Sequence, residues 1–258
     1  MKLWSGANKA MLFKHYENTP QKLSIMLIVL DEENLIKQWF DHLKNYNPFE
    51  VVVVDGGSTD QTKTFVNKYG SHFNLKLIEQ PMGDSFAEQR NLAKKHCRGD
   101  WILALDADET LSPNSPAVID KIIHDQSTVA FSFPRVALFP DPDHFIGQPN
   151  ADLQLRLFRN LPEISYIYKV HERPAYKGKP IHPGFFGTDQ GWQWCRIKRE
   201  IKMIHWGNLK SEAELLARGN RWQKFKTESK KRGLAVGAAE TFAPKKTNVK
   251  SRPLSELF

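Results

Sequence analysis

The stretch Trp101-Ile-Leu-Ala-Leu-Asp-Ala-Asp-Glu109 decides the fold. Residues 101–105 are apolar and are numerous enough to form a buried β-strand. The apolar run ends abruptly in Asp106, Asp108 and Glu109. We do not expect these carboxylates in the core, because burying an unpaired charge costs too much free energy. Since ligands bind outside the carboxyl ends of strands in an open α/β sheet, the stretch predicts such a strand with a ligand site at its end.

Asp106 and Asp108 are two positions apart and offer hard oxygen ligands. Such ligands suit Mg²⁺ or Mn²⁺, which commonly bridges to the phosphates of a substrate. The alternative interpretation is an acidic turn that leads into the next helix. The pattern of the residues before Trp101 favours the ligand site.

Strand-like and helix-like segments alternate through residues 1–125. The β-branched run Val51–Val54 indicates a fully buried strand of the parallel type. Ser85 and Glu88 form a capping box that opens a helix through about His96. The other expected elements are strands at 24–30, 75–78 and 101–105, and helices at 35–43, at 62–69 with Gly70 as the C′ residue, and from Ser112-Pro113 onward. This order predicts a mainly parallel sheet with helices on both faces.

The pattern changes from about Thr128. Expected strands at 128–133, 153–158, 164–170 and 201–206 are joined by loops rich in Pro and Gly. Residues 140–150 form a long polar loop, of the kind that often carries function. A final helix is expected at 211–232, followed by a loosely ordered segment at 234–258.

The charge of the chain is distributed unevenly. The 258 residues carry a net charge of +8, but residues 196–258 contain 16 Lys and Arg against 6 Asp and Glu. A nearly neutral body with a basic carboxyl-terminal quarter indicates either an anionic partner, such as a membrane or nucleic acid, or a solvated basic face with no partner. The two cysteines suit a reducing compartment, and neither a signal peptide nor a membrane-spanning run is visible. We therefore expect a soluble, cytoplasmic protein.

A second acidic position follows another expected strand. Asp55 comes directly after Val51–Val54, and Gly56-Gly57 then allow a close approach of the backbone. This arrangement is not the Gly-x-Gly-x-x-Gly dinucleotide fingerprint. A carboxylate here suits hydrogen bonds from a nucleobase or ribose; the alternative is a turn capped by Asp and Ser.

Three motifs now stand in a fixed order along about 110 residues. The first is Asp31-Glu32-Glu33 after the opening strand, the second is Val52–Thr62 with its Val-Val-Val-Asp-Gly-Gly-Ser-Thr-Asp-Gln-Thr sequence, and the third is Gln89–Ala93 followed by Gly99–Leu103 and the Asp-x-Asp pair. With these motifs the chain resembles a family 2 glycosyltransferase of the GT-A fold, although Asp31 stands where the family usually has Asn. The sequences of Glu88–Asn91 and of Asp-Ala-Asp-Glu are similar to those of the subgroup that adds a sugar to the lipopolysaccharide inner core.

The resemblance implies a set of ligand-binding residues. Asp106 and Asp108 would hold a divalent cation, Mn²⁺ or Mg²⁺, against the diphosphate of the donor, and His205 would complete its coordination. A cation there acts as a Lewis acid on the departing nucleotide diphosphate. The residues implied on the nucleotide-sugar side are Asp31, Glu33, Asp55, Arg90 and Asp106. Arg90 is placed to pair either with phosphate or with the carboxylates of the site, and a lone histidine such as His205 is also compatible with a structural role.

Family members invert the configuration of the transferred sugar, which requires a base for the acceptor hydroxyl. The weaker resemblance of the second half, at 155–159, 170–172 and 204–206, makes Glu172 the first candidate, with Asp152 and Asp189 as fallbacks. The alternative for Glu172 is a salt bridge to a neighbouring arginine such as Arg173. Trp192 and Trp194 suit either sugar stacking or the core.

We therefore expect a metal-dependent inverting transferase that uses a nucleotide-diphospho-sugar, UDP-linked, and a cell-envelope glycan or glycolipid acceptor such as lipopolysaccharide core. One GT-A domain would span 1–258, with a nucleotide-sugar-binding half at 1–125, an acceptor-side half at 126–210 and a basic helix and tail at 211–258. The basic helix would attach the enzyme to the inner face of the cell membrane. Nucleic acid is not expected as a partner, because the acidic strand ends would face its phosphates.

Two rival functions remain in view. A sugar-phosphate nucleotidyltransferase shares the sheet plan but needs a Gly-rich loop after the first strand, and residues 24–33 contain no glycine. A non-catalytic membrane-binding relative is the other rival, although Asp55, Asp106 and Asp108 are all present.

Overall fold

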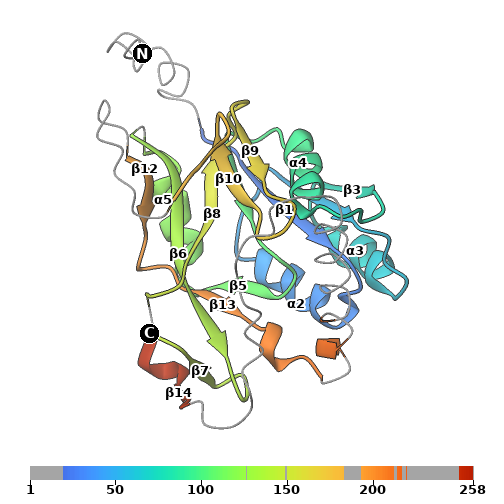
Figure 1. Cartoon of the computed structure of the whole chain (residues 1–258), viewed down its shortest axis with the longest axis vertical. Helices are drawn as coiled ribbons and strands as arrows, with labels where there is room; N and C mark the ends of the chain where they lie inside the picture. Colours follow the sequence, from blue (N-terminus) through green and yellow to red (C-terminus); the bar gives the residue numbers. More distant parts are fainter. Residues whose placement is uncertain are drawn as a thin grey trace.

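The computed structural model describes residues 20–125, 127–148, 150–182, 193–211, 214–216, 219 and 250–257. These residues form an 11-stranded mixed sheet and a separate three-stranded sheet (Figure 1). The expected α/β class is confirmed. The first half contains β1 (Leu23–Val29), α2 (Glu33–Leu43), β2 (Glu50–Asp55), α3 (Thr62–Gly70), β3 (Leu75–Glu79), α4 (Phe86–His96), β4 (Trp101–Ala104), β5 (Glu109–Leu111) and α5 (Ser115–Ile122).

The second half is mostly strands. It contains β6 (Thr128–Leu138), β7 (His144–Ile146), β8 (Leu153–Arg159), β9 (Ile164–Ile167), β10 (Arg173–Tyr176), β11 (Lys179–Pro180), β12 (Gln193–Ile197), β13 (Met203–His205), the 3₁₀ turn η1 (Gly207–Leu209), β14 (Arg252–Pro253) and the 3₁₀ turn η2 (Leu254–Leu257). No helix among the described residues is long and apolar enough to cross a membrane.

The parallel part of the large sheet has the strand order β3-β2-β1-β4. Residues Val51–Val54 of β2 are fully buried, which explains why their sequence is a continuous apolar run rather than an alternating one. β1 pairs in parallel with β2 on one side and with β4 on the other. The chain order therefore reverses beside β1, and a crevice at such a reversal is where open α/β sheets bind ligands.

The sheet continues beyond β4 through antiparallel strands. β8 pairs with β4 and then with the long strand β6, and β7 and β14 follow at the edge. β6 also pairs in parallel with β12 along its first half and with β13 along its second half. Both halves of the sequence thus contribute strands to one sheet, and the segment that carries His205 is attached to it through β6.

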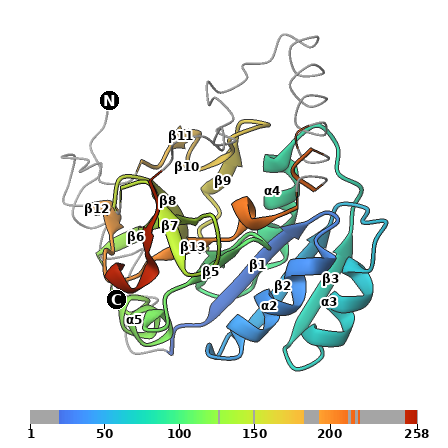
Figure 2. The ribbon, with the colours of Figure 1, turned by 90° about the horizontal axis from the view of Figure 1, so that it is seen from below.

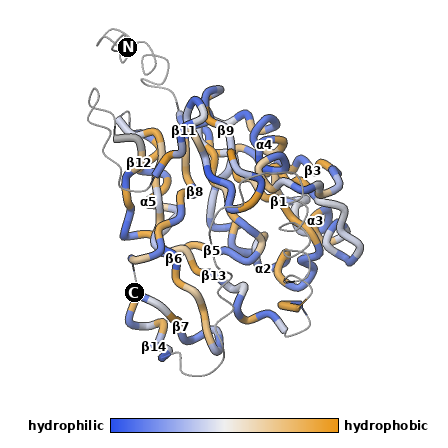
Figure 3. Tube along the Cα trace, viewed as in Figure 1, coloured by the Kyte–Doolittle hydropathy of each residue, from blue (hydrophilic) through white to orange (hydrophobic). Residues whose placement is uncertain are grey.

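Two apolar cores cover the two faces of the sheet. Side chains of α2, α3 and α5 pack on one face around Trp39, Phe40 and Trp101, whereas α4 and the three-stranded sheet cover the other face (Figure 2). A smaller cluster joins the far end of β6 to β7, β13 and η2. Figure 3 shows apolar residues along the strands of the sheet and polar residues on the connecting loops.

The small sheet β11-β10-β9 is held against α4 by side chains of the helix that form hydrogen bonds with backbone groups in and before β9. The amide of Asn91 donates to the Tyr166 carbonyl at 2.9 Å and accepts from the Tyr166 N–H at 2.7 Å. Lys94, one helical turn further, donates to the Leu161 carbonyl. α4 therefore fixes the position of the β9–β10 hairpin, which carries Glu172 in its connecting loop.

Several local expectations were wrong. Glu109 does not end the acidic turn but begins β5, which pairs with β13. α5 begins at Ser115 rather than at Ser112-Pro113, and the proline in its first turn is Pro116. Gly70 is the last residue of α3 rather than a C′ residue, and its role is steric: a Cβ there would lie 2.6 Å from Leu75 Cδ2.

The remaining differences lie in the loops and near the carboxyl terminus. The loop at 140–150 contains β7, and residues 252–257 of the segment expected to be loosely ordered form β14 and η2. Of the expected helix at 211–232, residues 211, 214–216 and 219 are described, and all of these except Ser211 are helical. Asp189, Trp192 and most of the basic helix lie outside the described residues, as does the side chain of Trp194.

Candidate functional site

The loops after β1 and β2 are joined by hydrogen bonds between their own side chains and backbone. Asp31 accepts from the Thr59 N–H at 2.8 Å, and its own N–H donates to Ser58 Oγ at 3.0 Å. Glu33 accepts from the Gln61 N–H at 2.8 Å. Asp31 adopts a positive φ of 52°, which a short polar residue tolerates better than most. Both predicted nucleotide residues therefore shape the loops at the carboxyl ends of β1 and β2, and their contact with a nucleotide stays a prediction.

Asp55 ends β2 and is fully buried. Its carboxylate accepts from the N–H groups of Gly57 and Ser58 and from the Ser58 hydroxyl, at 3.0, 2.9 and 2.5 Å. This is the Asp/Ser-capped turn that the sequence left open as an alternative. Gly57 has a φ of 95°, a conformation that favours glycine. A nucleobase contact to Asp55 remains a prediction and would have to use the lone pairs that these bonds leave free.

The turn after β4 holds buried carboxylates that are paired with arginine. Arg156 of β8 makes a bidentate contact with Glu109, with nitrogen–oxygen distances of 2.7 and 2.6 Å, and a weaker one of 3.3 Å with Asp106. Glu109 also accepts from the Asp106 N–H at 3.1 Å. The expectation that these acidic residues lie outside the core was therefore wrong for Asp108 and Glu109, which are 6% and 1% exposed. Arg156 makes the burial of Glu109 tolerable.

Arg90 of α4 joins the two sides of the site. Its Nη2 donates to Asp106 at 2.7 Å and its Nε donates to Glu172 at 2.6 Å. Its guanidinium lies 5.6 Å from the centre of the Tyr166 ring, within the range of a cation–π contact. Of the two alternatives for Arg90, the structure has the pairing with the carboxylates. The salt bridge considered for Glu172 is also present, but its partner is Arg90 rather than Arg173.

The charges of this cluster stabilise one another. Burial raises the pKa of Asp106, whereas the guanidinium groups of Arg90 and Arg156 lower it. The effect of the two arginines is the larger one, so the pKa of Asp106 lies below its ordinary value. Burial lowers the pKa of Arg90, and the carboxylates of Asp106 and Glu172 raise it well above the ordinary value. Asp106 and Arg90 therefore both carry their charges at neutral pH. Arg90 Nη1 is buried and has no hydrogen-bond partner among the described residues, so one donor is left for a ligand.

Asp108 and His205 lie together although they are far apart in the sequence. β13 pairs antiparallel with β5 so that His205 is opposite Glu109, and His205 Nε2 lies 3.4 Å from Asp108 Oδ2. Gly207 permits this approach: a Cβ at this position would lie 2.6 Å from Asp108 Oδ2 and 2.6 Å from His205 Cε1. A side chain would fill the space beside the pair.

This pair fits a divalent cation that is completed by its substrate. The described residues contain no group of three or more His, Cys, Asp or Glu side chains arranged to hold a metal. Asp108 and His205 offer one oxygen and one imidazole nitrogen, which suit Mn²⁺, and cations of this kind take further ligands from substrate phosphates and water. Both oxygens of Asp106 accept from arginines instead. The structure thus brings two of the three predicted ligands together.

The fallback candidate Asp152 is not part of this cluster. Asp152 pairs with Arg135 at 2.6 Å in a half-exposed contact near the start of β8. Asp189 lies outside the described residues. Of the two candidates that the structure describes, Glu172 lies beside Asp106, through their shared arginine.

Sequence reasoning missed Arg156, Tyr166 and Gly207. Arg156 stands in the apolar run Leu155–Phe158, and a lone arginine within a strand was a signal for a buried ionic partner. Tyr166 is buried with a hydroxyl that has no partner among the described residues, and burial raises the pKa of its phenol. Neither its role nor that of Gly207 has a local sequence signal, because both depend on segments that come together only in the fold.

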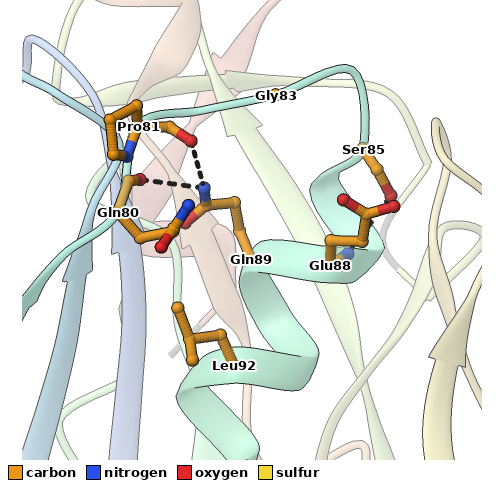
Figure 4. Close-up of a pocket in the computed structure, with 7 residues that line it drawn as sticks. All are labelled: Gln80, Pro81, Gly83, Ser85, Glu88, Gln89 and Leu92. Carbon is orange, nitrogen blue, oxygen red and sulfur yellow. Dashed lines mark hydrogen bonds between the residues drawn. The ribbon is translucent and has the colours of Figure 1, made fainter.

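A separate pocket lies between α4 and the loop after β3 (Figure 4). The amide nitrogen of Gln89 donates to the carbonyls of Gln80 and Pro81 across it, at 3.0 and 3.2 Å. Its lining residues are Gln80, Pro81, Gly83, Ser85, Glu88, Gln89 and Leu92. These are different residues from those of the carboxylate cluster, so the pocket and the cluster occupy different faces of α4.

The chain is similar to known proteins over its first two thirds. The family model described as glycosyl transferase family 2 matches residues 24–175. A TPR repeat-containing protein of Synechococcus elongatus is 31% identical over 151 residues, which are 58% of this chain and 35% of that protein. The poly(ribitol-phosphate) β-N-acetylglucosaminyltransferase TarS of Staphylococcus aureus is 34% identical over 97 residues, which are 35% of this chain and 17% of TarS. The chain thus spans about a third or less of these relatives.

Solved structures show the same fold. The structure of S. aureus TarS residues 1–349 in complex with UDP-GlcNAc aligns with a TM-score of 0.53 at 17% identity, over 71% of this chain and 58% of that one. The mannosyltransferase PcManGT from Pyrobaculum calidifontis, in complex with GDP-Man and Mn²⁺, aligns with a TM-score of 0.50 at 16% identity, over 78% and 65%. Since the family model covers more than half of the chain, this protein belongs to glycosyltransferase family 2.

Proposed function

We propose that this protein is a metal-dependent, inverting glycosyltransferase that uses a nucleotide-diphospho-sugar. The observation that carries the proposal is the arrangement at the carboxyl end of β4. The Asp108–His205 pair lies on one side of the turn, and Glu172 lies on the other, linked through Arg90 and Asp106. This arrangement offers a place for a donor diphosphate and a carboxylate for the acceptor.

The donor would bind over the crevice beside β1, with its nucleotide at the loops of Asp31 and Asp55. We assign a UDP-sugar, in keeping with the UDP-GlcNAc that the TarS structure contains. PcManGT is described with GDP-Man, so the fold accommodates both nucleotides. Arg90 would direct the N–H groups of its unpartnered Nη1 toward the diphosphate, because a guanidinium binds phosphate oxygens well.

Asp108 and His205 would hold the divalent cation, Mn²⁺ or Mg²⁺, together with the diphosphate. When bound, the cation supplies Lewis-acid stabilisation of the charge that develops on the departing nucleotide diphosphate. Asp106 would act beside them by orienting Arg90, since both of its oxygens are occupied by arginines. Gly207 would leave the space that the cation requires.

Glu172 would act as the general base that takes the proton of the acceptor hydroxyl. Inversion by direct displacement requires such a group on the face of the sugar opposite the leaving group. Glu172 comes from the β9–β10 loop, whereas Asp108 and His205 come from the β4–β5 turn and β13. The two groups therefore approach the reaction centre from different elements, as a base and a leaving-group site must.

The acceptor would be a cell-envelope glycan or glycolipid, and lipopolysaccharide core is our specific candidate. Support comes from the sequence resemblance of Glu88–Asn91 and of the acidic turn, and TarS, by its name, also acts on a cell-envelope polymer. We further propose a cytoplasmic enzyme that attaches to the anionic inner face of the membrane through its basic carboxyl-terminal segment. Residues 214–216 within this segment are helical and expose Leu215 and Leu216, which suits an interfacial helix.

Calorimetry of UDP binding with and without Mn²⁺ tests the proposal. The wild-type protein should bind UDP more tightly with Mn²⁺, and Asp108→Asn should abolish this difference while the protein stays folded, because Asn matches the shape of the buried Asp. Gly207→Ala should also weaken Mn²⁺-dependent binding, since its methyl group crowds both ligands. Gly83→Ala, where a Cβ meets open space, is the matched control. Normal Mn²⁺-dependent affinity in Asp108→Asn would overturn the metal assignment.

A further inference from the structure

We propose that Tyr168 and Arg173, at the loop end of the β9–β10 hairpin, form an acceptor subsite for an anionic sugar residue. The ring of Tyr168 would stack on the sugar, and Arg173 would bind its carboxylate or phosphate. This inference rests on the proposed function, because it takes Glu172 as the point where the acceptor hydroxyl reacts. It adds the chemical class of the acceptor, which the site around Glu172 does not specify.

The loop between β9 and β10 is anchored through three of its residues, Lys169, Val170 and Glu172. Lys169 pairs with Asp84 at 2.6 Å, and its carbonyl accepts from the Phe86 N–H at the start of α4. Val170 is buried, and Glu172 is held by Arg90. The loop is therefore held in a fixed position against the start of α4, and Figure 1 shows the β9–β10 hairpin close to this helix.

Tyr168 is exposed to solvent, although the loop that carries it is anchored. Its side chain is 48% exposed, and among the described residues the other large hydrophobic side chains classed as exposed are Leu215 and Leu216. Its backbone has a φ of 68°, a left-handed conformation that is unfavourable for a bulky residue. Strained backbone of this kind persists where the surroundings enforce it, and it is common at ligand sites.

Arg173 is the first residue of β10 and lies at the loop end of the hairpin, as Tyr168 does. It pairs with Ile167 across the two strands, whereas the next pair, Tyr166 with Pro174, is buried against α4. Because neighbouring residues of a strand point to opposite faces, Arg173 points outward. Arg173 is exposed, and its side chain makes no hydrogen bond or ion pair with any other described residue. It is therefore an available cation directly beside the candidate base.

The spacing and the charge of the hairpin suit an anionic oligosaccharide. Four residues of chain span at most about 14 Å, so a sugar at Tyr168 is a near neighbour of one that reacts at Glu172. Tyrosine combines an apolar ring with a polar hydroxyl, and arginine binds carboxylate and phosphate through two parallel hydrogen bonds. Residues 173–180 contain Arg173, Lys177 and Lys179 and no acidic residue, so the surrounding charge favours an anion.

Saturation-transfer NMR with two matched probes tests the subsite in the presence of UDP and Mg²⁺. Methyl glucuronide carries a carboxylate, and methyl glucoside is its neutral counterpart. The wild-type protein should bind the glucuronide several-fold more tightly. Arg173→Ala should remove this preference, whereas Lys179→Ala, which removes the same charge from the far end of the hairpin, should retain it. Equal binding of both probes by the wild type, or a preference that survives Arg173→Ala, would overturn the proposal.

Tyr168 is tested by substitutions that separate its ring from its backbone conformation. Tyr168→Asn tolerates the left-handed conformation but lacks the ring, and it should weaken the binding of both probes several-fold. Tyr168→Phe should restore most of the binding. Unchanged binding in Tyr168→Asn would contradict the stacking role. UDP binding with Mg²⁺ is measured in each variant: if the wild type does not bind UDP, the proposed function fails, whereas normal UDP binding without probe binding refutes the subsite alone.

Discussion

At the scale of single residues, the site is built from charges that are buried in pairs. Arg156 compensates Glu109, and Arg90 compensates both Asp106 and Glu172. Each pair removes two charges from water, which is tolerable only when geometry and hydrogen bonds are good. The pairs hold the acidic turn and the β9–β10 loop in fixed positions before any ligand binds. Positions fixed in advance are what a catalytic site requires, since a small displacement of a reacting group costs much of the rate.

Arg156 should therefore contribute strongly to stability. Arg156→Met leaves Glu109, whose side chain is 2% exposed, as an uncompensated buried charge, so the free energy of unfolding should fall by about 3–5 kcal/mol. Arg135→Met is the control, because Arg135 and its partner Asp152 are 36% and 43% exposed, and its loss should be below about 1 kcal/mol. Urea unfolding measures both values, and equal losses would contradict the assignment.

Glu172→Gln tests the base directly. The amide keeps the size of the side chain but cannot take a proton, so turnover should fall by about 10²- to 10⁴-fold. UDP affinity in the presence of Mn²⁺ should change little, because the proposed function assigns UDP and metal binding to the loops after β1, β2 and β4 and to His205. Asp152→Asn is the matched carboxylate control and should keep wild-type turnover. If Glu172→Gln turned over within a few-fold of the wild type, the role would pass to Asp152 or Asp189.

The sequence predicted the acidic site because its signal is local. Asp55 and Asp106 directly follow apolar runs, and the order of strands places their ends at one edge of the sheet. It did not predict that Arg156 would allow Glu109 to be buried, because the two residues are 47 positions apart. Patterns within a short window report on periodicity and turns, whereas a partner in another strand becomes visible only in the fold.

At the scale of elements, a partly buried histidine connects α2 to the segment after the acidic turn. The Leu111 N–H at the end of β5 donates to His42 Nε2 at 3.0 Å, so this nitrogen must be unprotonated. Tyr46, just after α2, lies within hydrogen-bond distance of the same nitrogen and of Ser115 at the start of α5. Burial lowers the pKa of His42 to about 4. The contact between α2, β5 and α5 therefore depends on a neutral imidazole.

This dependence predicts a loss of stability in mild acid. An unfolded histidine has a pKa near 6.5, so between that pH and about 4 the unfolded state binds the proton and the native state does not. The stability that a neutral His42 contributes is complete above pH 6.5 and should fall by about 2 kcal/mol from pH 7 to pH 5. Urea unfolding of His42→Gln, which accepts a hydrogen bond without titrating, should show a correspondingly smaller loss. Parallel losses in the two proteins would refute the prediction.

The elements of the first half were predicted well because each has its own pattern. The capping box at Ser85 is a case in point: the Ser85 hydroxyl accepts from the Glu88 N–H, and α4 ends at His96 as expected. β5 was missed because three residues are too few for a pattern, and its strand is formed by pairing with β13. β7 and β14 were missed for the same reason. Short strands follow from tertiary contacts rather than from local propensity.

At the scale of the whole molecule, the positive charge is concentrated in residues 196–258, whereas residues 1–195 are nearly neutral. This distribution favours an anionic partner for the carboxyl-terminal quarter alone. Residues 196–258 carry 16 basic and 6 acidic residues, so their net charge exceeds that of the complete chain. Each basic residue close to an anionic membrane contributes about 1 kcal/mol, and salt weakens the attraction. The protein should therefore sediment with anionic liposomes at low salt and be released at high salt. Equal sedimentation with neutral liposomes, or none with either, would remove the membrane proposal.

The pairing of β5 with β13 has a consequence for how the protein is made. Asp108 and His205 are separated by almost a hundred residues, and their approach depends on the strand Met203–His205 reaching its place between β5 and β6. Chains fold from the amino terminus as the ribosome releases them. The crevice beside β1 can therefore form early in synthesis, while the imidazole that completes the pair arrives late. A nascent chain would carry the loops after β1 and β2 before it could bring Asp108 and His205 together, so the two parts of the candidate site would form at different times.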